Sequence, residues 1–264
     1  MRLNNMPEKR EKRHPELLVL CQLFYPELVS TGQTLTELCE QLVHLGMDVE
    51  VVCGPPTILD KDKKTAKHTE HEGIRIRRVW GTRFPKLNLV GRVINQLTFA
   101  ASVFLYLLLR HPRKPILVLT NPPFLAITCA ILRVFKIIGP YIYLVFDVYP
   151  DTAVQLGVLK EKGLLSRLWE LFNTFTFKQA STIVVIGRCM QDVIKQKTEK
   201  SGLKLDDKLY YLNIWSDDKL ISAALDKENP LKKKWNLEQK FIVGYFGNMG
   251  RFHDMETIVK ALKS

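Results

Sequence analysis

Two aspartates lie four residues apart across a proline, in the stretch FDVYPDT at 146–152. A carboxylate in such a turn can accept the proton of a hydroxyl group or orient a sugar hydroxyl. The same residues also have a structural interpretation, in which Asp151 or Thr152 caps a helix and Asp147 pairs with a basic side chain. On the chemical interpretation, Asp147 is the candidate catalytic residue and Asp151 is a second candidate for contact with a ligand.

Short apolar runs alternate along the chain with segments of helical periodicity, and the aspartates follow one of these runs. A strand is expected at 16–22, an amphipathic helix at 34–46 and a second strand at 48–56. Such a βαβ unit implies a parallel sheet with right-handed crossovers. The whole pattern predicts a doubly wound α/β fold with helices on both faces of a parallel sheet. Further strands are expected at 74–80, 115–123, 141–151, 181–187 and 208–215, further helices at 88–110, 124–139, 166–180 and 188–198, and a mobile polar loop at 58–73.

Two more turns follow predicted strands, where ligands of an open parallel sheet bind. In YPELVSTGQ, Gly32 allows close backbone approach, and the N–H groups of the following helix favour an anion such as phosphate. Thr31, Gly32 and Gln33 are therefore candidate phosphate or acceptor contacts, although a simple helix-capping turn explains the same residues. Asn121, in the stretch TNPP, either bonds a ligand or belongs to a rigid turn that ends a strand.

The charge distribution favours a negatively charged partner. The formal net charge is +12, and the 74 residues of 73–146 contain eleven Lys or Arg but no Asp or Glu. This distribution fits an anionic membrane surface, although buried strands and helices also carry few acids. Nucleic acid is not expected as a partner, because no helix-turn-helix, zinc-finger or RNP signature accompanies the charge.

The longest apolar run, LTFAASVFLYLLL at 97–109, has 13 residues. It is shorter than the roughly 20 residues that span a bilayer. Basic residues flank it, with Arg92 before it and Arg110 and Arg113 after it. The run either lies in a membrane interface or forms a buried crossover helix.

The sequence offers little for metal or nucleophilic chemistry. The five cysteines are scattered without a CxxC pair, which disfavours a disulfide framework or zinc site and fits a reducing cytosol. His68 and His71 lack a third ligand nearby in the sequence, and GxSxG and Walker A motifs are absent. No metal or other cofactor is therefore expected.

Three stretches, in this order, resemble glycosyltransferase family 4 enzymes. FYPELVSTGQTLTELCEQLVHLGMDVEVVCGPP resembles the opening of those enzymes, with Met47 where histidine is usual. FDVYPD resembles the Asp-x-x-Pro turn of the branch that builds capsule, O-antigen and colanic-acid-type polysaccharides. YFGNMGRFHDMETIVKAL resembles the first β–loop–α segment of the second domain in that family. The resemblance runs from about Glu16 to Ser264.

The resemblance implies a GT-B fold, in which two Rossmann-like domains face each other across a cleft. In that family the N-terminal domain holds the acceptor, often a lipid-linked sugar. The C-terminal domain holds a nucleoside-diphosphate sugar as co-substrate, usually without a metal. By position, Asp147 would lie near the transferring sugar, and the residues around Gly32 near the donor phosphates. The donor diphosphate would contact Gly247, Asn248, Gly250 and Arg251.

The resemblance also implies four regions. They are a flexible tail at 1–15, an acceptor-binding Rossmann-like domain at 16–216, a linker at 217–240 and the start of the nucleotide-sugar-binding domain at 241–264. The last region is expected to contain a buried strand, a glycine turn and a helix, which dock on the first domain or on a partner, or are mobile.

The resemblance implies a location at the inner face of the cytoplasmic membrane. Because the resemblance stops early in the second domain, we expect a truncated sugar transferase that is inactive or impaired. Two alternatives stay open. One is the non-catalytic acceptor- or membrane-binding half of a split enzyme, which works with a separate C-terminal-domain subunit. The other is a sugar-nucleotide epimerase of the same fold.

Overall fold

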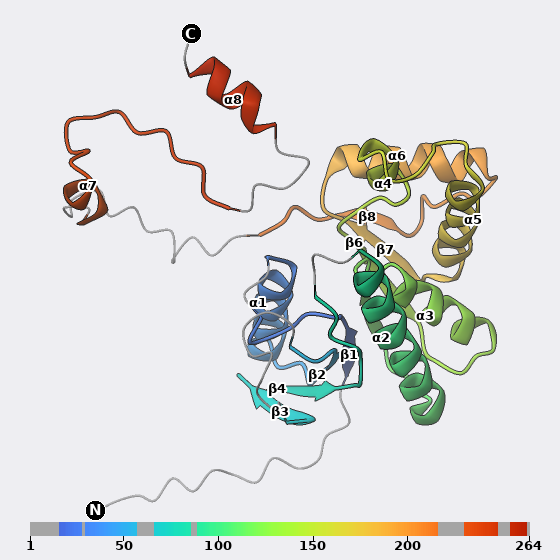
Figure 1. The fold of residues 1–264 in the computed structure, drawn as a ribbon. Helices are drawn as coiled ribbons and strands as arrows, with labels where there is room; N and C mark the ends of the chain where they lie inside the picture. Colours follow the sequence, from blue (N-terminus) through green and yellow to red (C-terminus); the bar gives the residue numbers. More distant parts are fainter. Residues whose placement is uncertain are drawn as a thin grey trace, which may run out of the picture.

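A computed structural model of the chain gives the fold (Figure 1). It describes residues 16–27, 30–56, 66–85, 89–215, 230–247 and 254–262. The tail expected at 1–15 and the candidate residues Asn248, Gly250 and Arg251 lie outside the described residues. The described part therefore covers most of the region predicted to be the first domain and portions of the region that follows it.

Eight strands form one sheet. They are β1 (Leu17–Leu20), β2 (Val49–Cys53), β3 (His68–His71), β4 (Ile74–Arg78), β5 (Ile116–Leu119), β6 (Tyr141–Val145), β7 (Thr182–Val185) and β8 (Leu209–Tyr211). Their order in the sheet is β3-β4-β2-β1-β5-β6-β7-β8. All neighbours are parallel except β3 and β4, which are antiparallel. The predicted doubly wound α/β fold is confirmed, with one antiparallel strand at its edge.

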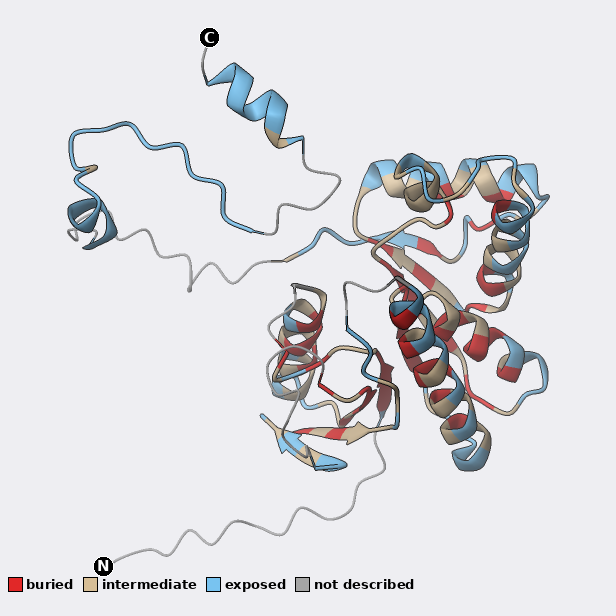
Figure 2. Ribbon diagram, in the orientation of Figure 1, coloured by how far each residue is buried: buried red, intermediate tan, exposed pale blue. Residues whose placement is uncertain are grey.

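Helices connect the parallel strands and cover both faces of the sheet (Figure 1). They are α1 (Ser30–His44), α2 (Leu89–Arg110), α3 (Phe124–Val134), α4 (Asp151–Gln155), α5 (Leu164–Gln179) and α6 (Arg188–Lys200). Two short helices, α7 (Pro230–Lys234) and α8 (Met255–Ala261), follow the last strand and have no buried residue. α1 packs Leu35 and Cys39 onto one face, in a cluster with Val19 of β1. On the opposite face α2, α3, α5 and α6 pack against Leu18, the neighbour of Val19 in the same strand. Successive residues of a strand thus face two separate cores. Figure 2 shows the central strands largely in red, as buried.

The edge strand β3 corrects the end of the loop predicted at 58–73, whereas residues 58–65 of that loop lie outside the described residues. His68–His71 (HTEH) pairs antiparallel with Ile74–Arg78, and Glu72 and Gly73 form the connecting turn with φ of 46° and 78°. Two residues with positive φ are typical of a tight hairpin turn. The strand has no apolar side chain, so hydrophobic periodicity does not reveal it. Besides the backbone pairing, His71 pairs with Glu40 at 2.9 Å and stacks on the Tyr25 ring.

The helix α2 extends the predicted apolar run at both ends. Among the described residues it is the one helix long and apolar enough to cross a membrane, and 28% of its most apolar stretch is buried. It joins β4 to β5 across one face of the sheet and packs Phe99 and Val103 into the core. It is therefore a crossover helix with one exposed side.

The region 241–264 differs from its prediction. Residues 241–246 form no strand, and Phe241 and Phe246 are 95% and 94% exposed. An apolar run becomes a strand only when a neighbour pairs with its backbone, and no described strand does so. The predicted helix is present as α8, whose first turn is capped by a hydrogen bond from the Thr257 N–H to the Asp254 carboxylate. α7 falls within the segment predicted to be a linker.

Candidate active site

Thr120 joins the carboxyl ends of two central strands, β5 and β6. Its backbone N–H and its hydroxyl both donate to the Leu144 carbonyl oxygen at 3.2 Å, and the hydroxyl oxygen accepts from the Phe146 N–H at 2.9 Å. Thr120 is buried, so these bonds are shielded from competing water. The network fixes the backbone at the point where Asp147 begins the turn after β6.

Asp147 lines a small hollow at this edge of the sheet, with room for about one water molecule at most. Burial raises the pKa of its carboxyl above the ordinary value of 3.8. No hydrogen bond or ion pair with another described residue holds this carboxylate. A half-buried carboxylate in this state can bond a substrate hydroxyl or accept its proton. The other lining residues are Thr120, Pro123, Tyr143, Val145, Val148, Tyr149, Trp169, Asn173, Phe177 and Ile194.

The indole of Trp169, on α5, packs against the turn that carries Asp147. It stacks on Tyr149 with ring centroids 5.6 Å apart and lies 6.0 Å from the Phe124 ring at the start of α3. One helical turn further along α5, the Asn173 side chain donates to the Tyr149 carbonyl oxygen. α5 therefore positions the candidate turn, and the prediction of separate local turns misses this long-range support.

Asp151 is the first residue of α4, and its carboxylate pairs with Lys197 of α6. Lys197 also pairs with Glu170 of α5 at 2.6 Å. These three side chains link α4, α5 and α6 beside the hollow. Asp151 is not the helix cap considered in the sequence analysis, because Pro150 is the N-cap residue of α4 and no side-chain capping bond is made. Its structural role is the ion pair, and contact with an acceptor stays a prediction.

The predicted glycine loop lies in the first turn of α1. Gly32 is buried, and a Cβ atom there would lie 3.3 Å from the Glu27 carbonyl oxygen, so glycine lets the helix pack closely on the preceding turn. Thr31 is half-buried, whereas Gln33 is exposed and donates to the Glu37 carboxylate at 3.2 Å. The close approach explains the glycine structurally, and phosphate binding by these residues stays a prediction.

Three candidate turns follow adjacent strands at the same edge of the sheet. β1 precedes Gly32, β5 precedes Asn121 and β6 precedes Asp147, and the three strands are neighbours in that order. Only the 120–123 turn and Asp147 meet around the hollow, to which that turn contributes Thr120 and Pro123. Asn121 is half-buried beside them but does not line the hollow, and Gly32 does not either.

Gly247 is the described member of the predicted donor-binding loop. Its φ of 147° lies in a region that side chains rarely adopt, so the position favours glycine. The residues that follow it lie outside the described part of the chain, and the expected diphosphate contacts stay a prediction.

Arg92 adds a cation near the site. It is exposed at the start of α2, and its charge acts on Tyr149, whose pKa is raised mainly by burial and by Asp147 and is lowered in part by Arg92. A cation at that place can attract a substrate phosphate. From the sequence alone Arg92 is only one member of the basic 73–146 stretch, because its approach to the Tyr149 turn depends on the path of α2 over the sheet.

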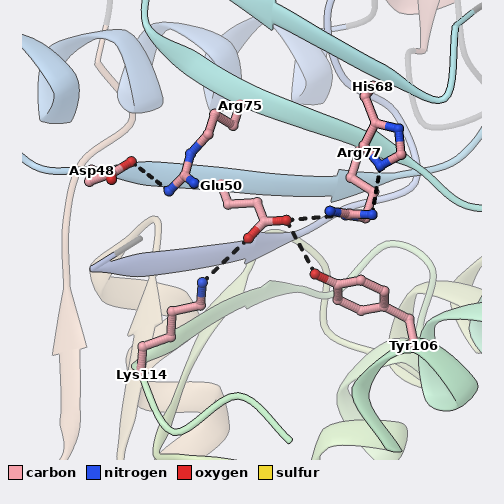
Figure 3. Close-up of polar contacts among 7 residues, drawn as sticks. All are labelled: Asp48, Glu50, His68, Arg75, Arg77, Tyr106 and Lys114. Atoms are coloured by element: carbon pink, nitrogen blue, oxygen red, sulfur yellow. Dashed lines mark hydrogen bonds and ion pairs between the residues drawn. The ribbon is translucent and has the colours of Figure 1, made fainter. Parts of the chain in front are cut away.

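A second polar cluster lies on the sheet beside α2 (Figure 3). One Glu50 oxygen accepts from Arg77 and from the Tyr106 hydroxyl, each at 3.2 Å, and the other accepts from Lys114 at 3.4 Å. Burial favours the neutral acid, but Lys114 and Arg77 outweigh it and hold the pKa of Glu50 below its ordinary value. Burial and the nearby Glu50 raise the pKa of Tyr106 to about 12. The cluster ties β2 to β4, α2 and the segment before β5.

An open hollow adjoins this second cluster and is lined by Glu50, His68, Thr69, Glu70, Arg75, Ile76 and Arg77. Its arginines already have acidic partners, since Arg75 pairs with Asp48 at 2.8 Å and Arg77 with Glu50. The charges of this hollow are therefore largely compensated, and the edge around Asp147 is the better candidate for chemistry.

The described residues offer no evident metal centre. No group of three or more His, Cys, Asp or Glu side chains that could hold a metal ion occurs in the described part of the chain. Cys39 of α1 and Cys53 of β2 are buried, and burial raises the pKa of their thiols to about 12 and about 11. Such thiols are poor nucleophiles and poor metal ligands at neutral pH.

Comparison with known proteins places this site in a family. The model of the glycosyl transferase 4-like domain matches residues 31–197, which include Asp147 and every helix and strand between α1 and β7. The probable glycosyltransferase WbjE of Pseudomonas aeruginosa is 30% identical over 186 residues, or 69% of this chain and 45% of that protein.

Solved structures show the same fold at lower identity. Sucrose-phosphate synthase from Thermosynechococcus elongatus superposes with a TM-score of 0.66 at 15% identity, covering 94% of this chain and 59% of that one. The UDP-forming α,α-trehalose-phosphate synthase from Burkholderia vietnamiensis gives a TM-score of 0.55 at 12% identity, covering 85% and 54%. These likenesses confirm the predicted GT-B type of fold.

This chain spans less than half of the curated relative and between half and three fifths of these two solved chains. The family match itself covers well over half of the 264 residues. The chain belongs to the glycosyl transferase 4-like domain family, as the resemblance predicts.

Proposed function

We propose that this protein takes part in glycosyl transfer from a nucleoside-diphosphate sugar to a lipid-linked or polysaccharide acceptor in cell-surface polysaccharide synthesis. The observation that carries the proposal is Asp147. Within the matched domain it is a half-buried carboxylate with a raised pKa and no bond to another described residue, at the edge where open parallel sheets bind ligands.

In the proposed reaction Asp147 orients an acceptor hydroxyl and accepts its proton as the oxygen bonds to the anomeric carbon of the donor sugar. The bond from that carbon to the diphosphate breaks, and its electron pair leaves with the nucleoside diphosphate. A pKa raised toward neutrality makes a carboxylate a better base at neutral pH. Thr120 and Trp169 act through the backbone, because they fix the turn that presents this carboxylate.

The donor would be held by the loop that contains Gly247, Asn248, Gly250 and Arg251. Arg251 would stabilise the negative charge that grows on the leaving diphosphate, and we propose that no metal ion is required. These residues would belong to a second Rossmann-like domain opposite the Asp147 edge, completed within one polypeptide or by a separate subunit. Asn121, Asp151 and the turn of Thr31, Gly32 and Gln33 would line the acceptor side.

The proposed location is the inner face of the cytoplasmic membrane, where a lipid-linked acceptor resides. The basic stretch 73–146 supports this location, because five of its basic residues are exposed in the described part of the chain. Anionic lipid attracts such residues, each contributing about 1 kcal/mol near the surface. Those five are Arg83, Arg92, Arg110, Arg113 and Lys136.

A sugar-transfer assay tests the proposal, and it uses the protein in the form that its host cell produces. Membranes that contain the protein are given a panel of radiolabelled nucleoside-diphosphate sugars, and label is followed into the lipid-linked fraction. We expect donor-dependent labelling, reduced at least about hundredfold by Asp147→Asn, since general-base catalysis contributes about 10²–10⁴-fold. Glu199→Gln, an exposed change on α6, is the matched control.

Two outcomes of that assay would contradict the proposal. Undiminished transfer by the Asp147→Asn protein would remove Asp147 from the reaction. Conversion of a nucleotide sugar into its epimer, with no label in any acceptor, would favour an epimerase instead.

A further inference from the structure

α5 carries an apolar stripe on its solvent side. Leu164, Leu165, Leu168, Leu171 and Phe172 recur at helical spacing and are exposed, Leu164 by 82% and Leu171 by 64%. The opposite side of the helix packs Phe177 into the core. In a helix of a soluble domain the outward side is usually polar. Packing against the sheet does not explain why these apolar side chains are exposed.

α2 has the same feature. Its buried side faces the sheet through Phe99, Val103 and Leu107. Its outer side is apolar and exposed at Val90, Val93, Ile94, Leu97, Leu105 and Leu109. Sequence alone shows the apolar run, but only the fold shows that half of it faces outward.

α3 lies between these two helices and packs against both (Figure 1). It adds exposed Ile131, Val134 and Phe135 at its end. Since all three helices turn their inner sides to the same face of the sheet, their exposed stripes share the outer side of one helical layer. Exposed apolar patches of this extent usually mark an interaction site.

The charge around this layer is almost entirely positive. The segments α2, α3 and α5 and the turns next to them expose one acid, Glu161, and eight basic residues. The basic residues are Arg92, Arg110, Arg113, Lys136, Lys160, Lys162, Arg167 and Lys178. An apolar stripe bordered by basic side chains is the pattern of a helix that lies in the interface of an anionic membrane.

We propose that the outer sides of α2, α3 and α5 dock on an anionic lipid bilayer, with the apolar stripes in the boundary between headgroups and acyl chains. This inference rests on the proposed function and names the surface that performs its membrane contact. It also sets an orientation, because the inner side of α5 supplies Trp169 and Asn173 to the hollow around Asp147. A lipid-linked sugar anchored beside α5 would therefore present its head next to that carboxylate, with Arg92 close to the same turn.

Vesicle binding and local probes test the docking surface. The intact protein is mixed with vesicles of phosphatidylglycerol and phosphatidylethanolamine, or with pure phosphatidylcholine vesicles, and is then sedimented. We expect binding to the anionic vesicles that is at least tenfold weaker for the double variant Leu168→Glu, Leu171→Glu. Leu45→Glu is the matched control and should bind normally, because Leu45 is 81% exposed at the end of α1, on the other side of the sheet.

An environment-sensitive fluorophore reports which side of the protein faces the membrane. It does so without the added negative charges of the glutamate variants. The label is placed on Leu168→Cys, Ile94→Cys or Leu45→Cys in a Cys189→Ser background, since Cys189 is the exposed cysteine. On anionic vesicles the emission at positions 168 and 94 should shift to the blue, and emission at position 45 should not change.

Three results would overturn the inference. The first is equal vesicle binding by the double variant and the wild type, and the second is unchanged fluorophore emission at positions 168 and 94 on anionic vesicles. The third is a blue-shifted emission at these positions without vesicles, in a protein that has the mass of a dimer. The last would assign the surface to a second copy of the chain. Transfer by the unmodified protein to a water-soluble acceptor, measured without vesicles, separates the two claims. If that transfer occurs while docking fails, the proposed function stands and only the surface is wrong.

Discussion

Trp169 of α5 stacks on Tyr149 with ring centroids 5.6 Å and ring planes 29° apart, so a helix and a strand-ending turn separated by 20 residues form one unit. Asn173 of the same helix donates to the Tyr149 carbonyl oxygen. Asp147 lies two residues before this tyrosine. The position of the candidate carboxylate is thus set jointly by β6 and by α5.

Replacing Trp169 by alanine should destabilise the protein and disturb the Asp147 turn. Aromatic pairs contribute about 0.5–1.5 kcal/mol each beyond the area they bury, and Trp169 makes two such contacts, with Tyr149 and Phe124. We expect a loss of about 1–3 kcal/mol in urea denaturation, together with weaker transfer. Trp80→Ala, which removes a tryptophan that is 68% exposed, should change stability by less than about 0.5 kcal/mol. Equal losses in the two variants would contradict the role given to Trp169.

Asp147→Asn should leave the fold as stable as before or make it more stable. Because burial raises the pKa of this carboxyl in the folded state, ionising it opposes folding. The unfavourable contribution appears as the pH rises from 3.8 through the folded pKa, and it is fully present at higher pH. The stability of the variant relative to the wild type should therefore rise over this window, as measured by denaturant unfolding from pH 3 to pH 7. A clear loss of stability in the variant at pH 7 would show that the carboxylate supports the fold.

Glu50→Gln should show the opposite pH dependence. The folded pKa of Glu50 lies below its ordinary value of 4.5, so its contribution to stability is present above that pH and is lost as the pH falls through the folded pKa. At pH 7 we expect a loss of about 1.5–3 kcal/mol, the range for hydrogen bonds to charged groups. The difference between variant and wild type should shrink below pH 4.5. A difference that stays constant down to pH 3 would show that the loss is not electrostatic.

Gly139→Ala should destabilise the entry into β5. A Cβ atom at Gly139 would lie 2.2 Å from the Arg113 carbonyl oxygen, which belongs to the backbone and cannot rotate away. Overpacking of this kind costs about 1–3 kcal/mol. Gly187→Ala is the matched control, because its φ of −165° suits any residue and no atom lies within 4 Å of the added carbon. A melting temperature unchanged in the Gly139 variant would contradict this close approach.

The parts of the fold that can be predicted from sequence are those that hydrophobic pattern dictates. Strands such as Ile116–Leu119 are buried on both faces and therefore read as continuous apolar runs. The helices between them show the 3.6-residue period, and the turns follow from Gly and Pro. The family resemblance agrees with this framework, because its motifs follow the ends of strands that the hydrophobic pattern also predicts.

The parts that cannot be predicted depend on contacts distant in sequence. β3 is held by backbone pairing with β4 and by polar contacts of its two histidines, so the hydrophobic pattern gives no signal for it. Phe241 and its neighbours show the reverse case, since an apolar run without a described partner strand forms none. In the site, sequence identifies Asp147, but the ring of Trp169 and the approach of Arg92 follow from how α5 and α2 cross the sheet.

Hydrogen exchange with bound substrates tests the central claim, that ligands meet this domain at the Asp147 edge. The intact protein is exchanged with and without a nucleoside-diphosphate sugar and a lipid-linked sugar in detergent, and protection is mapped along the chain. We predict slower exchange at 120–124 and 146–152, where β5 and β6 end, and a smaller effect in Asp147→Asn. Protection confined to the hollow at 68–77, with none at the ends of β5 and β6, would contradict the account.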